Sequence, residues 1–227
     1  MSQRIVALVP MRHDSQRVAG KNYRSFAGRM LYRYIVDTLL ECSFVDEIVI
    51  DTDSPVITED VSQHYPGVKL LERPQHLRAG EVPMNDVLLH DTSMVQADYY
   101  IQTHSTNPLL RSETISRAIE LFLENCPEYD SLFSVTRLQS RLWDGQAKAI
   151  NHDPAVLLRT QDLPGVYEEN SCIYIFSRAV LEARGNRIGE KPFMFEIDSN
   201  EAWDIDEELD FSIAEFLYTN TVGLKEK

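Results

Sequence analysis

The feature that most constrains this fold is a regular alternation of short apolar runs with segments of helical periodicity. Runs of apolar and β-branched residues predict strands at 4–9, 47–50, 68–71, 99–102, 132–135 and 172–176. Apolar residues at helical spacing predict helices at 30–40, 54–65, 85–95, 113–123, 180–183 and 207–217. Such alternation is typical of an α/β fold, with a mainly parallel sheet and helices on both faces.

The chain length suits one domain of this kind, so we assign residues 1–227 to a single domain. The pattern becomes irregular from Arg137 to about Gly165, where polar turns separate short apolar stretches. We interpret the segment from about 137 to 195 as a β-rich arm, inserted in the domain, that packs on a second subunit. The alternative is a β-insertion that stays on its own domain.

Composition excludes several classes of protein. Hydrophobic residues make up 43% of the chain and charged residues 26%, which is ordinary for a globular protein and too apolar for a disordered one. No apolar run reaches the roughly 18 residues of a membrane span, and the N-terminus lacks a signal-peptide pattern. The three cysteines lie far apart, which predicts neither disulfides nor a metal cluster and favours the cytoplasm.

The formal net charge is −14, which argues against nucleic acid or an anionic membrane as a partner. The charge is unevenly distributed, however. Residues 1–29 hold six basic residues and one acidic residue, whereas residues 196–215 hold nine acidic residues and no basic one. One interpretation is a basic loop and an acidic, solvated helix face. The other is a site with two poles, one for polyphosphate and one for divalent cations.

Basic residues gather in the segment 9–22, VPMRHDSQRVAGKN, directly after the first predicted strand. Parallel sheets bind their ligands at the carboxyl ends of strands, so this loop lies where a ligand is expected. It lacks the glycine-rich pattern of a Walker loop. It offers Arg12, Ser15, Arg17 and Lys21, and arginine and lysine suit the oxygens of a triphosphate. A solvated basic loop without a ligand is the alternative.

Two carboxylates stand at alternate positions near the C-terminus, Asp204 and Asp206. On a strand, alternate side chains point to the same face, and paired carboxylates there suit Mg²⁺, a hard cation that prefers oxygen ligands. Mn²⁺ suits the same ligands. The alternative is a pair of acids that cap the helix predicted to begin at residue 207.

The basic loop resembles the signature of the acylneuraminate cytidylyltransferases, the CMP-N-acetylneuraminic acid synthetase family, and more loosely that of the CMP-Kdo synthetases. Arg12, Ser15, Lys21 and Asn22 fall on matching positions without a gap. Six further segments match the family's motifs in the family's order: 51–53 (DTD), 72–74 (ERP), 106–109 (TNPL), 159–164 (RTQDLP), 169–174 (ENSCIY) and 203–211 (WDIDEELDF). The resemblance therefore covers nearly the whole chain.

The resemblance implies a Rossmann-like, three-layer nucleotidyltransferase fold and a homodimer joined through the arm. It implies an enzyme that transfers CMP from CTP to an acidic acceptor, a nonulosonic (sialic-acid-like) sugar, and releases pyrophosphate. Lys21, Arg12 and Asp206 are then the catalytic residues, and Asp204 and Asp206 are the ligands of Mg²⁺. The nucleotide-binding residues that it implies are Arg12, Ser15, Lys21, Asn22 and Arg73.

The residues that the resemblance assigns to the acceptor come from several segments: His104, Asn107, Arg159, Gln161, Asn170 and Tyr174. Arg159 is the expected partner of the acceptor's carboxylate. His104 stands where the family carries glutamine. It can donate to a carboxylate, act as an acid or base near neutral pH, or bond only to a neighbouring turn. Tyr174, taken alone, is more typical of core packing.

Departures from the family pattern at His13, Asp14, Met84 and His104 leave the acceptor open. The alternative function keeps CTP but uses a non-sugar acceptor, such as a phosphonate or a polyol phosphate. A glycosyltransferase with a DxD metal motif is less favoured, because such enzymes usually carry the motif in mid-chain and would give the basic loop no role. A non-catalytic nucleotide-binding protein would lack a phosphate or metal group, whereas both are present here.

Overall fold

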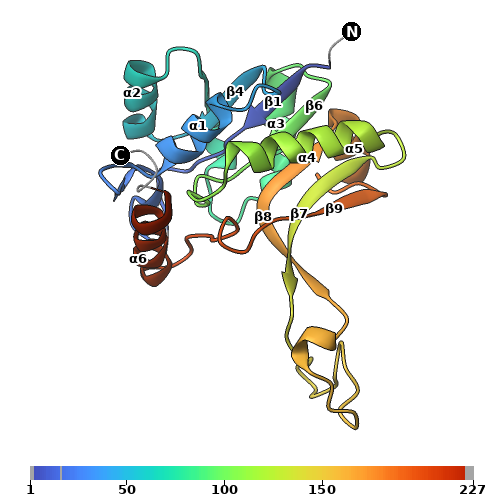
Figure 1. Ribbon diagram of the computed structural model, residues 1–227. Helices are drawn as coiled ribbons and strands as arrows, with labels where there is room; N and C mark the ends of the chain where they lie inside the picture. The colour runs from blue at the N-terminus through green and yellow to red at the C-terminus, as the bar shows by residue number, and fades with distance from the viewer. Residues whose placement is uncertain (1–2, 16, 223–227) are drawn as a thin grey trace.

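The computed structural model describes residues 3–15 and 17–222 (Figure 1). In this part of the chain, seven strands form one sheet in the order β5-β4-β1-β6-β8-β7-β9. The strands are β1 (Ile5–Leu8), β4 (Glu47–Thr52), β5 (Lys69–Glu72), β6 (Tyr99–Gln102), β7 (Ser131–Leu138), β8 (Val166–Phe176) and β9 (Pro192–Glu196). Only β8 runs against its two neighbours among these strands. The predicted, mainly parallel sheet is confirmed.

Helices cover both faces of the sheet. The α-helices within the described residues are α1 (Tyr32–Leu40), α2 (Pro55–His64), α3 (Met84–Met94), α4 (Ser112–Asn125), α5 (Arg178–Arg184) and α6 (Glu208–Leu217), of which α6 packs on the basic loop rather than on the sheet. Ile5 and Ala7 of β1 pack in a cluster with α1, α2 and α4, whereas Val6 and Leu8 pack with α3 and α5. This alternation produces the three layers that were predicted. None of the described helices is long and apolar enough to cross a membrane.

The arm is narrower than the sequence predicts. β7 and β8 continue past the sheet as an antiparallel ribbon, and residues 139–165 between them project away from the core (Figure 1). The predicted range of about 137–195 was too wide, because β8 pairs with β6 and β7, and Phe195 of β9 is buried in the core. The sequence analysis missed β9, since a five-residue run beginning with Pro192 gives a weak strand signal.

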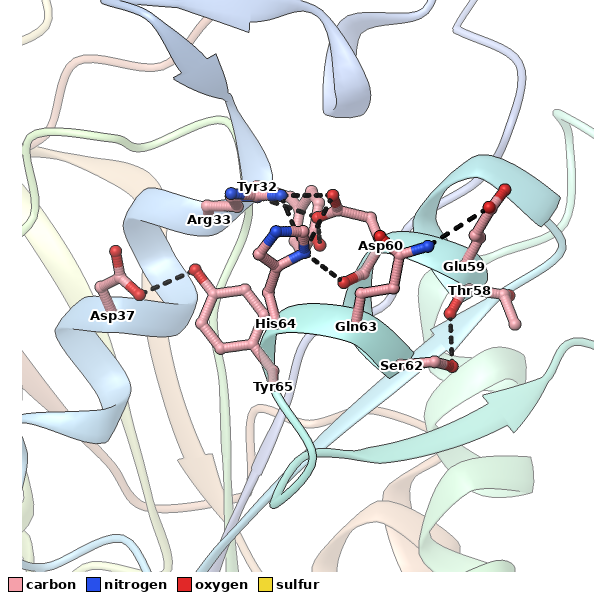
Figure 2. A network of polar contacts seen from close by, with 10 residues as sticks. All are labelled: Tyr32, Arg33, Asp37, Thr58, Glu59, Asp60, Ser62, Gln63, His64 and Tyr65. Atoms are coloured by element: carbon pink, nitrogen blue, oxygen red, sulfur yellow. Dashed lines mark hydrogen bonds and ion pairs between the residues drawn. The ribbon is translucent and has the colours of Figure 1, made fainter.

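Helices α1 and α2 are joined by a polar network around Asp60 (Figure 2). Asp60 accepts hydrogen bonds from the Tyr32 hydroxyl and from the Arg33 guanidinium, whose Nε lies 2.8 Å from Asp60 Oδ2. His64 bonds to the Asp60 carbonyl at 2.9 Å. Burial alone would raise the pKa of Asp60, but the hydrogen bonds from Arg33 and Tyr32 hold it below its ordinary value. The network therefore favours a charged carboxylate and holds α2 against α1.

Candidate active site

The carboxyl ends of β1 and β6 lie side by side in the sheet. After β1 the chain continues to β4 and β5 on one side of this pair of strands. After β6 it continues to β7 and β8 on the other side. Parallel α/β sheets bind their ligands at such a point. Two loops start here, the basic loop 11–22 after β1 and the segment 103–111 after β6, which we call the β6 loop.

Hydrogen bonds hold the start of the basic loop against β4. Met11 N donates to the Asp51 carbonyl at 2.8 Å, and His13 N donates to Asp53 Oδ1 at 2.7 Å. The His13 ring stacks on Tyr23, with the ring centroids 5.2 Å apart. These contacts fix the path of the loop before it reaches Lys21 at the start of a short 3₁₀ helix.

Two of the predicted nucleotide-binding residues order the loop itself. Ser15 Oγ accepts a hydrogen bond from Val18 N at 3.5 Å. The buried side chain of Asn22 donates to the Arg12 carbonyl at 2.9 Å and accepts from Ser105 Oγ at 2.7 Å. Asn22 therefore ties the basic loop to the β6 loop. Direct contact of Ser15 or Asn22 with a nucleotide stays a prediction.

Residues 203–206, which we call the acidic segment, have no regular secondary structure, so they are not the strand that the sequence analysis assumed. The β6 loop holds their backbone instead. Ile205 N donates to the Thr106 carbonyl at 3.0 Å, and Asn107 Nδ2 donates to the Trp203 carbonyl at 3.3 Å. Ile205 is fully buried in one cluster with Val18 of the basic loop and residues of α6. Apolar packing therefore brings the acidic segment to the basic loop.

The two poles of charge meet at this place. Lys21 Nζ donates to the Ile205 carbonyl at 2.5 Å and lies 4.0 Å from Asp206 Oδ1. Arg17 donates to the same Asp206 oxygen at 2.5 Å. Burial lowers the pKa of Lys21, while the charges of Asp204 and Asp206 oppose that effect. The basic and acidic segments thus lie against each other rather than on two separate solvated faces.

Arg12 adds a further positive charge to the basic loop. It is half-buried, and within the described residues its guanidinium has neither a hydrogen-bond partner nor an ion pair. A guanidinium in this state offers its N–H groups to an anionic ligand.

The carboxylates of Asp204 and Asp206 fit a hard divalent cation. Asp204 Oδ1 is buried and has no hydrogen-bond partner among the described residues. Burial raises the pKa of Asp204, whereas a hydrogen bond from Thr106 opposes the rise. An unpaired carboxylate oxygen in this position is costly unless a cation or a proton satisfies it. The cap of α6 is formed by Glu207 and Asp210, so the predicted alternative of a capping pair at the DxD residues does not apply.

Arg73 lies in a separate buried cluster near the ends of β4 and β5. Its guanidinium pairs with Asp51, and both side chains are almost fully buried. Burial and the Asp51 charge raise the pKa of the neighbouring Asp91. Ligand atoms of Asp51, His90 and Asp91 lie within 4.8 Å of one another, and one oxygen of each carboxylate is buried without a hydrogen-bond partner among the described residues. The predicted contact of Arg73 with a nucleotide stays a prediction.

The predicted acceptor residues His104 and Tyr174 belong to one linked group. Gln102, at the end of β6, bonds to His104 at 2.9 Å and accepts a hydrogen bond from Arg187 at 2.6 Å. The Arg187 guanidinium lies 3.5 Å from the centroid of the Tyr174 ring, and the Tyr174 hydroxyl donates to Glu169. Burial, together with the charges of Arg187 and Lys21, lowers the pKa of His104 to about 3. The ring is therefore neutral near pH 7.

Sequence reasoning missed Gln102 and Arg187. Gln102 is the last residue of an apolar strand, and Arg187 lies in the loop between α5 and β9 among other charged residues. The segment 102–108 drew attention for His104, but it gave Gln102 no role, and Arg187 stands in no motif.

Asn107 and Asn170 both have partners within the fold. Asn107 is buried and holds the acidic segment, as described above. Asn170 links β7 and β8 where their register shifts, because its Oδ1 accepts from Ser134 Oγ at 2.6 Å and its Nδ2 donates to Thr136 Oγ1 at 2.8 Å. Contact of either asparagine with an acceptor stays a prediction.

Arg159 and Gln161 lie on the projecting arm. Both are exposed, and Arg159 forms an ion pair with Asp162 at 2.7 Å. Figure 1 shows the arm projecting away from the sheet beyond β7 and β8. The predicted contact of Arg159 and Gln161 with the acceptor stays a prediction.

The fold and the charged site define the class of protein. The solved structure of a CMP:2-keto-3-deoxy-manno-octonic acid synthetase complexed with CTP has the same fold, with a TM-score of 0.68, 16% identity, and 95% of this chain and 98% of that chain covered. The likeness places the chain in the α/β fold of the nucleotidyltransferases, as predicted.

The family follows from sequence matches. The family model described as Cytidylyltransferase matches residues 6–226, so the chain belongs to the cytidylyltransferase family and is an enzyme of that kind. It is 29% identical to the post-translational flagellin modification protein B of Campylobacter coli, over 94% of each chain. It is 26% identical to a pseudaminic acid cytidylyltransferase of Campylobacter jejuni, over 94% of this chain and 95% of the relative. The resemblance seen in the motifs is confirmed.

Proposed function

We propose that the enzyme transfers CMP from CTP to an acidic sugar of the nonulosonic class and releases pyrophosphate. The observation that carries this proposal is the meeting of Lys21 and Arg17 with Asp206 beside the end of β1. A nucleoside triphosphate needs cations around its phosphates, and transfer of a nucleotidyl group needs stabilised charge on the leaving pyrophosphate.

In the proposed reaction, a hydroxyl of the acceptor attacks the α-phosphorus in line, and the bond to the pyrophosphate oxygen breaks. Lys21 and Arg12 bind oxygens of the triphosphate and stabilise the charge that develops on the leaving group. The Lys21 ammonium is already largely desolvated by the protein, so its attraction to a phosphate is weakened little by water. Arg12 is half-buried and free of other partners among the described residues, which supports the same role.

We further propose that Asp204 and Asp206 hold Mg²⁺, with Mn²⁺ able to replace it. When bound, the cation would neutralise phosphate oxygens and screen the carboxylates from the triphosphate. The unpartnered Oδ1 of Asp204 supports this assignment. Asp206 would give up its contacts with Arg17 and Lys21, and these two side chains would then be available to phosphate.

The nature of the acceptor is supported by a relative. A pseudaminic acid cytidylyltransferase matches 94% of this chain, and pseudaminic acid is itself a nonulosonic acid. His104 and Arg187 are linked through Gln102 at the carboxyl end of β6, where an acidic sugar would find hydrogen-bond donors. A phosphonate or polyol phosphate acceptor would use the same nucleotide half of the site, so only the acceptor distinguishes these alternatives.

We propose that the enzyme is a homodimer and acts in the cytoplasm. The arm exposes the apolar side chains of Ile150, Val156, Leu157 and Leu158, and Leu157 is 89% exposed. Neighbouring exposed apolar residues favour a protein interface. A second copy of the chain could bring Arg159 to the residues proposed to bind the acceptor. All three cysteines are free, which supports a reducing compartment.

The test measures pyrophosphate released by the purified protein from CTP and Mg²⁺, with nonulosonic acids, phosphonates and polyol phosphates as acceptors. Release with a nonulosonic acid supports the proposal, and release only with another class overturns the acceptor. No release with any acceptor overturns the reaction. Lys21→Ala is expected to abolish turnover, whereas the matched control Lys191→Ala, at an exposed residue before β9, retains it. Equal turnover of both variants would contradict the role of Lys21.

A further inference from the structure

Gln102, His104 and Arg187 form a chain of hydrogen bonds on the acceptor side of the site. Arg187 Nη1 lies 2.6 Å from Gln102 Oε1. Gln102 Nε2 lies 2.9 Å from His104 Nε2 and 3.2 Å from the Thr103 carbonyl. Gln102 is fully buried, so these three contacts set the orientation of its amide.

Two of these partners determine the orientation of the Gln102 side-chain amide. A guanidinium only donates, so the Gln102 atom that faces Arg187 has to be the oxygen. The Thr103 carbonyl only accepts, so the Gln102 atom that faces it has to be the nitrogen. Amide orientations are often ambiguous, but here both ends give the same answer independently. The Gln102 NH₂ group therefore faces His104.

The orientation of Gln102 determines the proton position on His104. Since Gln102 donates to His104 Nε2, that nitrogen accepts and carries no proton, and a neutral imidazole then carries its proton on Nδ1. We propose that Arg187 and Gln102 are positioning residues that hold His104 as the Nδ1–H tautomer, so that the ring presents a hydrogen-bond donor to an oxygen atom of the acceptor substrate. The choice of that partner rests on the proposed function.

The donor is available. His104 Nδ1 has no hydrogen-bond partner among the described residues, and the side chain is half-buried rather than sealed in the core. The charges of Arg187 and Lys21 both act on the ring. Both charges and the burial keep the ring neutral, so Nε2 stays an acceptor and the pKa of about 3 makes His104 unsuitable as an acid or base near pH 7. Of the roles predicted for His104, hydrogen-bond donation is the one that fits.

Contacts other than the hydrogen bond to Gln102 hold Arg187 in place. Its guanidinium carbon lies 3.5 Å from the centroid of the Tyr174 ring, a cation–π contact. Its backbone N donates to Asn85 Oδ1 at 3.3 Å. Within the described residues no carboxylate pairs with it, so Gln102 is its hydrogen-bonded side-chain partner. Arg187 therefore orients Gln102, and through Gln102 it orients His104.

The direct test is the tautomer itself. In protein labelled with ¹⁵N at its six histidines, the two-bond ¹⁵N–¹H correlations distinguish Nδ1–H from Nε2–H, and the His104→Gln variant identifies the His104 signals by their loss. We expect a neutral Nδ1–H ring for His104 at every pH from about 5 to 8. A proton on Nε2, or titration within this range, would overturn the proposal without any reference to activity.

Variants of the chain test the positioning role. In Gln102→Glu the carboxylate only accepts, so His104 has to place a proton on Nε2, and the spectrum is expected to change accordingly. Arg187→Gln removes the guanidinium that orients Gln102, and the single Nδ1–H signal is expected to be lost. Arg184→Gln, at an exposed residue of α5, removes the same charge nearby and is expected to keep the wild-type spectrum. An unchanged spectrum in Arg187→Gln would contradict the positioning role of Arg187.

Kinetics test what the donor contacts. His104→Leu is expected to raise the KM of the acceptor about tenfold, the loss of one good hydrogen bond, while the KM of CTP changes less than about twofold. His104→Gln keeps a donor and is expected to stay within about threefold of wild type. An equal rise in both KM values, or none in that of the acceptor, would overturn the substrate contact. If the spectrum shows Nδ1–H but the wild type uses no nonulosonic acid, the proposed function is wrong. The positioning of the His104 tautomer by Gln102 and Arg187 is then still supported.

Discussion

Two carboxylates in this molecule, the buried Asp60 and the half-buried Asp204, have opposite environments. Asp60, between α1 and α2, accepts hydrogen bonds from Tyr32 and Arg33, and its pKa lies below the ordinary value (Figure 2). Asp204, in the acidic segment, has a buried oxygen without a donor among the described residues, and burial raises its pKa. The fold thus satisfies one acid completely and leaves the other partly unsatisfied.

The difference indicates which of the two carboxylates stabilises the folded state. A carboxylate whose pKa is lowered on folding stabilises the folded state, whereas one whose pKa is raised destabilises it at neutral pH. An acid kept at a cost in stability beside Lys21 is best explained by a ligand that satisfies it. The same substitution at both positions, aspartate to asparagine, therefore separates a structural carboxylate from a functional one.

The largest effect is expected for Asp204→Asn. Turnover should fall about 100- to 1,000-fold, because the variant would lose a carboxylate ligand of the proposed Mg²⁺ site. The free energy of unfolding should not fall, because asparagine removes a charge that burial disfavours. Pyrophosphate release and urea denaturation of the same preparation measure both quantities. Turnover within tenfold of wild type would contradict a role for Asp204 in the site.

Asp60→Asn should show the reverse pattern. We expect the free energy of unfolding to fall by about 3 kcal/mol, because Arg33 would keep its charge while its carboxylate partner is lost. Both KM values and kcat should match wild type at temperatures where the variant is folded, since Asp60 lies between α1 and α2 and not at the site. A stable but inactive variant would show that the two carboxylates are not separable in this way.

The pH dependence of stability gives a smaller effect with a defined sign. The pKa of Asp60 is lowered in the folded state, so its contribution is complete above the ordinary aspartate pKa of about 3.9 and is lost as the pH falls through the folded value. The difference in unfolding free energy between wild type and Asp60→Asn should be constant near neutral pH and shrink below about pH 4. Denaturant titrations across this range measure it, and a difference that grows in acid would contradict the lowered pKa.

The sequence was sufficient for the parts that depend on local patterns. Strand and helix periodicity predicted the layers, because the residues alternate between two apolar faces, as Ile5 and Val6 do. A site with two poles was one of two interpretations of the uneven charge, and Lys21 and Asp206 do lie 4.0 Å apart. The two residues are close because β1 and β6 are parallel neighbours, so the loops that follow them start side by side. The burial of Ile205 in one cluster with Val18 then holds the acidic segment against the basic loop.

Long-range contacts set the limits of prediction. Arg187 reaches Gln102 from a loop 85 positions away in the chain, and nothing near Arg187 in sequence indicates that pairing. Arg73 stands in a motif suggestive of nucleotide contact, yet its side chain is buried against Asp51, since a strand neighbour supplies the carboxylate. Arg159 was matched to the family by sequence, but the arm carries it away from the core, a displacement that only three-dimensional structure reveals.

The smallest effect on stability is expected for Arg17→Gln, which tests the functional side of the division. Arg17 pairs with Asp206 at 2.5 Å, but the two side chains are 61% and 44% exposed. Exposed ion pairs contribute about 0–1 kcal/mol, and salt screens them. Urea denaturation should therefore place the variant within about 0.5 kcal/mol of wild type, with the difference vanishing at high salt. A fall in the free energy of unfolding as large as that of Asp60→Asn would mean that the Arg17–Asp206 pair stabilises the fold. Asp206 would then not be an acid kept for a ligand.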